Sequence, residues 1–313
     1  MFAIGVENRL LCAIALLAGA APALALGWLR CGRAGVSWRK RALATALLPP
    51  FAAFFSHLLY CLVDVEYTIY SYSVGYLFAF WEKGYMFYGG MLGAMLALLA
   101  VGGADRLTML EQYAPSAAWM IAAARVAEGF LGQGYGEYWY GGPFLRRFPF
   151  MVYDPYYEEW AWALFMLEAL VALALFWLLL KRKATWQGDG ALMLLGLYAS
   201  AQIVLESLRR DEFLRWGFVR VEEVASAAVV LAVLVCYCLR ARGGKALWKA
   251  ACFGLYALMA VLCVLLEFAT EGRIPFLAFL DVDACYMAMA GACALMGGCV
   301  LWMRRLCGAK PAA

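Results

Sequence analysis

The sequence predicts an all-α protein, a polytopic integral membrane bundle of about nine transmembrane helices. Two features of composition support this class: 66% of the 313 residues are hydrophobic and only 15% are charged. A soluble domain is about half apolar and about one quarter charged, so this chain lacks the polar side chains that would cover a soluble core. The third observation is that apolar runs of about 20 residues, long enough to cross a bilayer core, recur along the whole chain.

About nine segments meet this length requirement. The first is followed by an arginine-rich segment rather than by a small-residue cleavage site, so we interpret it as a helix and not as a cleaved signal peptide. The second contains Pro49 and Pro50, which membrane helices tolerate where neighbouring groups satisfy the freed carbonyls. The fourth is the least apolar. The predicted helices span residues 10–28, 42–63, 86–102, 114–131, 160–180, 189–207, 221–239, 249–267 and 283–303.

The distribution of basic residues predicts the orientation of these helices. If the N-terminus lies outside, most of the 26 Lys and Arg residues fall on the inner side, including the clusters at residues 30–41, 181–183 and 240–249. Inner loops of membrane proteins are enriched in Lys and Arg. We therefore expect the N-terminus outside and the C-terminus inside, as an odd number of crossings requires.

Two long outer loops, residues 64–85 and 132–159, are rich in tyrosine, tryptophan and phenylalanine. Amphipathic rings of this kind favour the headgroup zone of a bilayer. The loops are therefore either an ordinary aromatic belt or a surface that faces lipid or substrate on the outer leaflet.

Ionisable and polar side chains recur at one depth, the outer half of several predicted helices. Charged groups inside a bilayer are costly and usually mark functional sites. Arg125 and Glu128 lie three residues apart and share one face of the fourth helix. We predict a polar cavity that opens to the outer headgroup region; the alternative for each charged pair is a structural ion pair. The other polar residues at this depth are His57, Tyr88, Glu168, Tyr198, Gln202, Glu206 and Arg209.

These residue types favour a phosphate-bearing ligand. An arginine binds phosphate through two charge-assisted hydrogen bonds, and a nearby tyrosine or carboxylate can act as general acid or base. Glycines beside the polar residues let a backbone approach a ligand closely. The single histidine, and cysteines without CxxC spacing, argue against a metal site. We expect no metal, no cofactor and no nucleic-acid partner.

Several segments resemble motifs of the bacterial prolipoprotein diacylglyceryl transferases, in the same order. Residues 81–93, W-E-K-G-Y-M-F-Y-G-G-M-L-G, resemble W-D-G-G-M-S-F-H-G-G-L-x-G. Residues 111–115, E-Q-Y-A-P, resemble D-x-x-A-P, and residues 125–136, R-V-A-E-G-F-L-G-Q-G-Y-G, are similar to R-x-G-N-F-x-N-G-E-x-W-G. Residues 196–209 resemble G-Y-G-x-x-R-x-x-x-E-x-x-R, with a slip of one residue at the glycine.

The resemblance implies a seven-helix membrane domain at residues 1–240 and an additional two-helix segment at residues 241–313. It implies an enzyme of the bacterial cytoplasmic membrane whose site faces the outer leaflet. The implied reaction moves a diacylglyceryl group from phosphatidylglycerol, or another anionic phospholipid, to the lipobox cysteine of a secreted lipoprotein precursor, and glycerol phosphate leaves. By position, the catalytic residues would be Tyr88, Tyr198 and Glu206, and the substrate-binding residues would be Arg125 for the phosphate, with Glu128, Gly89, Gly90, Gly136, Gln202, Arg209 and His57.

Some motif positions carry a different residue in this chain. Tyr88 stands where the family pattern has histidine, Glu128 where it has asparagine, and Gln202 where it has arginine. His57 stands in place of a second-helix arginine. A relative that binds phospholipid but has altered or lost catalysis is therefore one alternative. A transporter is another, although we find no internal repeat of the kind common in transporters.

Overall fold

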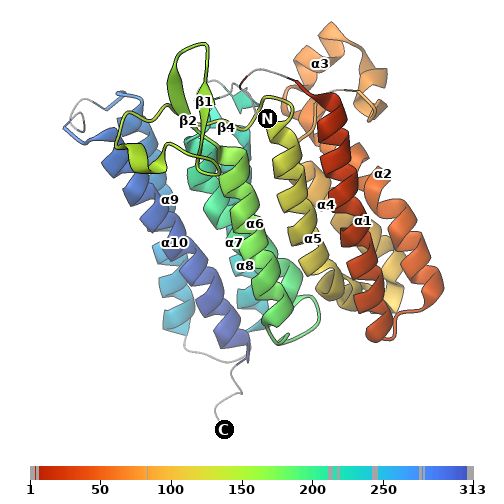
Figure 1. Ribbon diagram of the computed structural model, residues 1–313. Helices are drawn as coiled ribbons and strands as arrows, with labels where there is room; N and C mark the ends of the chain where they lie inside the picture. Colours follow the sequence, from red (N-terminus) through yellow and green to blue (C-terminus); the bar gives the residue numbers. More distant parts are fainter. Residues whose placement is uncertain are drawn as a thin grey trace.

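The computed structural model is a bundle of long, roughly parallel helices (Figure 1). It describes residues 4, 7–82, 84–210, 214–216, 219–241, 246–274, 277 and 279–308. Lys83, which belongs to the segment at residues 81–93, lies outside the described residues. Eight stretches of the described chain are long and apolar enough to cross a membrane. This confirms the predicted class, an all-α polytopic membrane bundle.

One of these stretches, Phe87–Gly129, contains two helices separated by a short 3-10 turn, η2 (Gly103–Asp105). The described residues therefore form nine long helices, as the apolar runs predict. These are α1 (Arg9–Arg33), α2 (Trp38–Val63), α4 (Phe87–Gly102), α5 (Arg106–Gly129), α6 (Leu164–Lys181), α7 (Asp189–Ser207), α8 (Val221–Arg240), α9 (Ala246–Thr270) and α10 (Val282–Gly308).

Two predicted helix boundaries are wrong. Helix α5 begins at Arg106 rather than near residue 114 because its polar first half is satisfied inside the bundle. There Glu111 is buried, accepts a hydrogen bond from Gly190 N at 2.6 Å and pairs with Arg182. The predicted helix at 160–180 begins too early, because Glu159–Trp162 is strand β2, paired antiparallel with β1 (Met151–Asp154).

Apart from η2, which joins α4 to α5, the short elements between the helices gather at one end of the bundle. Figure 1 shows α3, β1, β2 and β4 at the end where the N-terminus lies, and the C-terminus at the opposite end. Both aromatic loops of the sequence therefore lie at the same end of the bundle. Which end faces outward remains a prediction. The short elements at the end with the N-terminus are α3 (Val65–Ser71), η1 (Val74–Phe78), η3 (Pro143–Leu145), β1, β2, β3 (Arg215–Trp216) and β4 (Val219–Arg220).

Helices α2 and α4 pack in close backbone contact because α4 begins with glycines. A Cβ atom added at Gly93 would lie 2.2 Å from the carbonyl oxygen of Phe51, and one at Gly89 would lie 2.4 Å from that of Phe55. Small residues of this kind let membrane helices approach each other. This packing holds the start of α4 against α2.

The last two helices pack against α7 and α8 through a shared apolar core. A buried ion network at the end opposite the N-terminus strengthens this contact. Asp189, the first residue of α7, is fully buried and lies 2.9 Å from the guanidinium of Arg304 on α10. Asp189 also pairs with Arg182 at 2.6 Å and accepts a hydrogen bond from Tyr237 at 3.0 Å. Helices α9 and α10 are thus integrated into the bundle.

The glycine contacts predict a sharp difference between two neighbouring substitutions. Gly93→Ala places a methyl group against the Phe51 backbone, which cannot move aside, so we expect a loss of about 1–3 kcal/mol. Gly90→Ala is the matched control, because its nearest atoms would lie 3.8 Å away. Thermal unfolding in detergent should show a lower midpoint for Gly93→Ala only. Equal midpoints for the two variants would contradict the close packing of α2 against α4.

Candidate functional site: a buried arginine network

Arg125 of α5 lies at the centre of a buried polar network. Its Nη1 donates to Glu128 Oε2 at 2.8 Å, and its Nε donates to the hydroxyl of Tyr198 at 3.1 Å. The same Nε lies 3.0 Å from Glu168 Oε2 of α6. The guanidinium also lies over the ring of Phe87, 4.9 Å from its centroid. Helices α4, α5, α6 and α7 therefore meet at this one side chain.

A second arginine, Arg209, follows directly after α7 and shares a carboxylate with Arg125. Glu128 contacts Arg125 through one oxygen and Arg209 through the other. Arg209 Nη1 also lies 3.5 Å from Glu206 Oε2, and Glu206 Oε1 lies 3.8 Å from Arg220 Nη1. Glu128 thus bridges two guanidinium groups.

Gln202 connects the carboxylates on the other side of the network. Its Nε2 donates to Glu168 Oε1 at 2.7 Å and lies 3.4 Å from Glu206 Oε2. Gln202 is fully buried, and Glu168 and Glu206 are each only 1% exposed. The polar stripe predicted along this helix, Tyr198–Gln202–Glu206–Arg209, therefore faces the network as one unit.

Tyr88 reaches the network from α4 by way of α8. Its hydroxyl lies 2.6 Å from the Ser226 hydroxyl, which donates to the carbonyl of Glu222 at 2.6 Å. Glu222 accepts from the backbone N–H of Phe87 at 2.8 Å, and its other oxygen lies 3.9 Å from Arg125 Nη2. Helix α8 therefore completes the enclosure of Arg125.

Several members of this network are absent from the predicted site. The polarity of Glu168 was apparent from the sequence, but its role as a partner of Arg125 was not. Glu222 lies in the first turn of α8, where acidic residues are common because they favour the helix dipole. That ordinary position conceals its contact with Arg125. The absent members are Arg220, Glu222 and Ser226, whereas Glu168 was predicted to line the polar cavity without a catalytic or substrate-binding role.

Three predicted site residues lie in other contacts. His57 is fully buried, and its ring nitrogens lie 3.0 Å from the Gly84 carbonyl and 2.9 Å from the Tyr76 carbonyl. It therefore positions the loop before α4. Gly89 packs against α2, as described above, and Gly90 faces the same helix with more space. The substrate-binding roles expected for these three residues remain predictions.

Gly136 lies over the network, where the loop after α5 pairs with the segment after α7. It forms an antiparallel bridge with Arg209, and the flanking bonds join Arg210 N to the Tyr135 carbonyl and Glu137 N to the Leu208 carbonyl. A Cβ atom at Gly136 would lie 2.9 Å from that Leu208 carbonyl, so a larger residue would separate the two segments. The loop therefore covers the arginines at the end of the bundle where the N-terminus lies.

Tyr138 anchors this cover. Its hydroxyl donates to Asp154 of β1 at 2.7 Å, and the guanidinium of Arg210 lies 4.1 Å from its ring centroid. Burial, with the hydrogen bond to Asp154, raises the pKa of Tyr138 to about 12. The phenol therefore stays neutral and keeps donating across the physiological range of pH.

The charges of the network do not fully satisfy one another. Arg125 Nη2, Glu168 Oε2 and Gln202 Oε1 are buried and form no hydrogen bond, although the first two have ion-pair contacts with Glu222 and Arg125. Buried polar atoms are usually hydrogen-bonded, so these atoms have capacity for a polar ligand. Among the described residues, no group of three or more His, Cys, Asp or Glu side chains is placed to hold a metal ion. A ligand with an acceptor oxygen for Arg125 Nη2 and with hydroxyl donors for the two oxygens fits this set.

A family model described as prolipoprotein diacylglyceryl transferase matches residues 4–239. The chain belongs to this family. It is also similar to a curated protein of Verminephrobacter eiseniae (strain EF01-2), the phosphatidylglycerol–prolipoprotein diacylglyceryl transferase, with 29% identity over 153 residues. That match covers 44% of this chain and spans about half, 51%, of the relative.

Family membership confirms the resemblance drawn from the motifs, and with it a multi-pass membrane protein of a transferase family. The matched residues end one position before the last residue of α8, so α9 and α10 lie beyond them. The division at residue 240 remains a prediction. The two last helices share a core with α7 and α8, and this packing makes them part of the same membrane body.

The role of Gln202 predicts a loss of stability when its amide is removed. Gln202→Leu removes the amide donor that Glu168 and Glu206 share, and we expect a loss of about 1–3 kcal/mol. The control is Gln133→Leu, an exposed glutamine in the loop after α5, which should change stability by less than about 0.5 kcal/mol. Thermal unfolding in detergent measures both. Unchanged stability of Gln202→Leu would show that the amide does not support the carboxylates.

Proposed function

We propose that this protein transfers a diacylglyceryl group from phosphatidylglycerol to the cysteine thiol of a secreted lipoprotein precursor. The proposal rests on family membership and on one structural observation. Two buried arginines, Arg125 and Arg209, converge on the same carboxylate, that of Glu128. A position between two guanidinium groups suits a phosphodiester, because arginine binds phosphate oxygens through paired charge-assisted hydrogen bonds.

Glu128 marks where the phosphate binds. Its side chain is 16% exposed, whereas those of Arg125 and Arg209 are 7% and 3% exposed. The carboxylate therefore lies on the more open side of the arginines, where a ligand arrives. When phosphatidylglycerol binds, its phosphate takes over the contacts that Glu128 makes with both guanidinium groups.

The reaction follows from this placement of the phosphate. The cysteine sulfur forms a bond to the terminal glycerol carbon of the diacylglyceryl group, and the bond from that carbon to the phosphate oxygen breaks. The thiol loses its proton, and glycerol phosphate leaves with one more negative charge on its phosphate. Arginines placed around the leaving oxygens stabilise that charge as it develops. This is the work that we assign to Arg125 and Arg209.

Three further residues are assigned to proton transfer and positioning. We assign the passage of the thiol proton to Tyr88, which stands at the histidine position of the family pattern and is held by Ser226. Glu206 is the carboxylate that receives the proton. Tyr198 holds the guanidinium of Arg125 in place through its hydroxyl. A general acid or base must lie within hydrogen-bond reach of the transferred proton, and the precursor cysteine therefore enters beside Tyr88.

Membrane placement follows the same proposal. The protein lies in the bacterial cytoplasmic membrane with its N-terminus outside, because most Lys and Arg residues fall on the other side in that orientation. Arg125 lies in the last turn of α5, whose end accepts a hydrogen bond from Asn8 N, so the network is near the N-terminal end. Both substrates are then available at one surface: the donor from the outer leaflet and the precursor after its export.

A second candidate is a relative that binds phospholipid but no longer transfers the group. The Glu128 contacts favour it, because a carboxylate that already pairs with both arginines competes with an incoming phosphate. Binding and transfer must therefore be measured separately.

Complementation tests the proposed transfer. Bacteria depleted of their own diacylglyceryl transferase would express this chain, and the mass of a model lipoprotein would be followed. We expect a gain of one diacylglyceryl unit with the wild-type chain. We expect at least about a tenfold loss of transfer with Arg125→Lys. Lysine keeps the positive charge but lacks the planar guanidinium that donates two parallel hydrogen bonds to a phosphate.

Arg9→Ala is the control, because Arg9 forms an exposed pair with Glu7 at the start of α1, outside the arginine network. Immunoblots verify that each variant reaches the membrane. No mass gain from a wild-type chain that is present and that binds phosphatidylglycerol would exclude the transferase and leave the lipid-binding relative.

Replacing Glu128 tests its competition with phosphate. Glu128→Asn removes the carboxylate from between the arginines, so phosphatidylglycerol should bind more tightly by at least about tenfold. Titration of the purified protein with short-chain phosphatidylglycerol measures this change. Glu66→Asn, an exposed site in the outer loop, should leave the affinity unchanged. Weaker binding to Glu128→Asn would mean that Glu128 assists the ligand rather than competing with it.

A further inference from the structure

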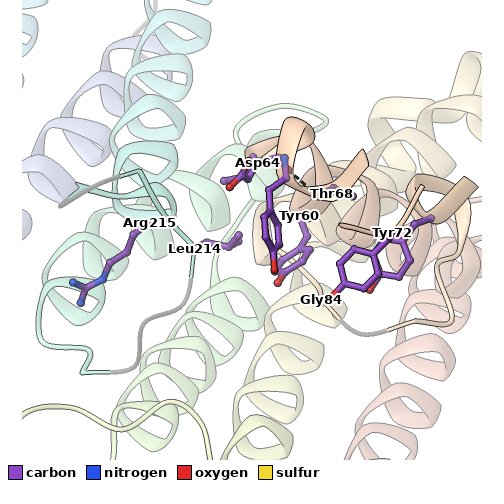
Figure 2. Close-up of a pocket in the computed structure, with 10 residues that line it drawn as sticks. Tyr60, Asp64, Thr68, Tyr72, Gly84, Leu214 and Arg215 are labelled. Atoms are coloured by element: carbon purple, nitrogen blue, oxygen red, sulfur yellow. Dashed lines mark hydrogen bonds between the residues drawn. The ribbon is translucent and has the colours of Figure 1, made fainter. Parts of the chain in front are cut away.

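A cavity of about 300 Å³ lies at the end of the bundle where the N-terminus lies. Four parts of the chain surround it: the end of α2, the helix α3, the turn η1, and Leu214 with the first residue of β3. Its lining shares no residue with the arginine network, so it is a separate site. Figure 2 shows Tyr60 and Tyr72 around one space, with Leu214 at its edge and Arg215 beyond Leu214. The lining includes Tyr60, Asp64, Tyr67, Tyr72, Tyr76 and Arg215.

Tyrosine rings form the walls of this cavity. Tyr60 comes from the last turn of α2, Tyr67 from α3, and Tyr76 from η1, and Tyr72 lies between the last two elements. Tyr72 and Tyr76 stack with their centroids 4.4 Å apart and their planes 14° apart, so the pair presents one flat aromatic surface. Aromatic faces attract cations, and cages of several rings are a common way to hold ammonium groups.

The charges around the rings favour a cation as well. The Asp64 carboxylate is exposed and lines the cavity, and one of its oxygens accepts from the backbone N–H of Tyr67 at 3.2 Å. In Figure 2, Arg215 lies on the far side of Leu214, away from Tyr60 and Tyr72. The aromatic half of the cavity therefore has a negative charge, and its opposite edge has a positive one.

The surroundings indicate that the ligand is a lipid. Large apolar side chains near the cavity are exposed: Leu62, Val65, Ile69 and Trp216 are 50%, 39%, 42% and 54% exposed. Trp216 also donates to the Val63 carbonyl at 2.7 Å, which joins β3 to the end of α2. Exposed apolar and aromatic residues at the end of a transmembrane helix favour the headgroup zone. A ligand in this cavity would therefore meet lipid headgroups.

We propose that this cavity binds the headgroup of a zwitterionic phospholipid, with the ammonium group against the tyrosine rings and Asp64 and the phosphate toward Arg215. Phosphatidylglycerol has no ammonium group, so this lipid is not the proposed donor. The site would attach the outer loops to bulk lipid beside the reaction site. It does not depend on whether the chain transfers diacylglyceryl groups.

The test is a titration of the purified full-length protein in detergent, followed by native mass spectrometry. The probes are short-chain phosphatidylethanolamine, phosphatidylglycerol with the same chains, and soluble O-phosphoethanolamine. The wild-type protein should bind phosphatidylethanolamine more tightly than soluble O-phosphoethanolamine. Equal affinity for these two would assign the cavity to a soluble ammonium compound and overturn the lipid proposal.

Two substitutions locate the ammonium group. Asp64→Asn removes the charge but keeps an oxygen that can still cap α3, so the fold is retained. It should weaken phosphatidylethanolamine binding by about threefold to fivefold. Tyr72→Leu should weaken it by about threefold, whereas Tyr72→Phe keeps the ring and should stay within about twofold of wild type. Tyr156→Leu, a residue 83% exposed in the β1–β2 loop, is the control.

Neither Asp64→Asn nor Tyr72→Leu should change phosphatidylglycerol binding, which belongs to the arginine network. Arg125→Lys should weaken phosphatidylglycerol binding and leave phosphatidylethanolamine binding unchanged, so the two proposals fail independently. The cavity proposal is overturned if Asp64→Asn and Tyr72→Leu both bind phosphatidylethanolamine as the wild type does. If Asp64→Asn does not fold, equal binding by Tyr72→Leu and Tyr72→Phe overturns it.

Discussion

The burial of Arg125 within a membrane bundle is the constraint on which the rest of the structure depends. A guanidinium in hydrocarbon is costly unless charged and polar partners surround it. Its partners come from three other helices: Glu168 from α6, Tyr198 from α7 and Glu222 from α8. Each of these helices must therefore lie at a defined depth and rotation. The polar network that makes the site possible also sets the arrangement of the bundle around it.

Close packing elsewhere supports this arrangement. The start of α4 delivers the Phe87 N–H to Glu222 and the Phe87 ring to Arg125, so its position matters for the whole network. The glycines of α4 hold it against α2, with Gly93 in backbone contact. At the opposite end of α7, the buried Asp189 binds α7 to α10. Helix α7 is therefore held at its start by Asp189 and at its end by the arginine network.

The two lipid sites that we propose use opposite chemistry. Around Glu128, guanidinium groups converge on an anion position, and the ligand is a phosphate. Around Asp64, tyrosine rings and a carboxylate form a position for a cation. The first is buried among helices because reaction chemistry requires exclusion of water. The second lies among the short elements at the end of the bundle where the N-terminus lies, with exposed apolar side chains beside it. A membrane enzyme with both could hold its donor in one site and bulk lipid in the other.

The sequence by itself determined the membrane class, the approximate helices and the stripe from Tyr198 to Arg209, because hydrophobic length and helical period are local properties of the chain. It also determined the family, through motifs whose order and spacing persist where single residues differ. Only the tertiary structure decided that Glu128 bridges two arginines and that Glu222 contacts Arg125, because those contacts join residues far apart in the chain. It likewise placed His57 against the loop before α4 rather than beside Arg125. A residue type predicts what a side chain can bind, but its partner is decided by which helices pack together.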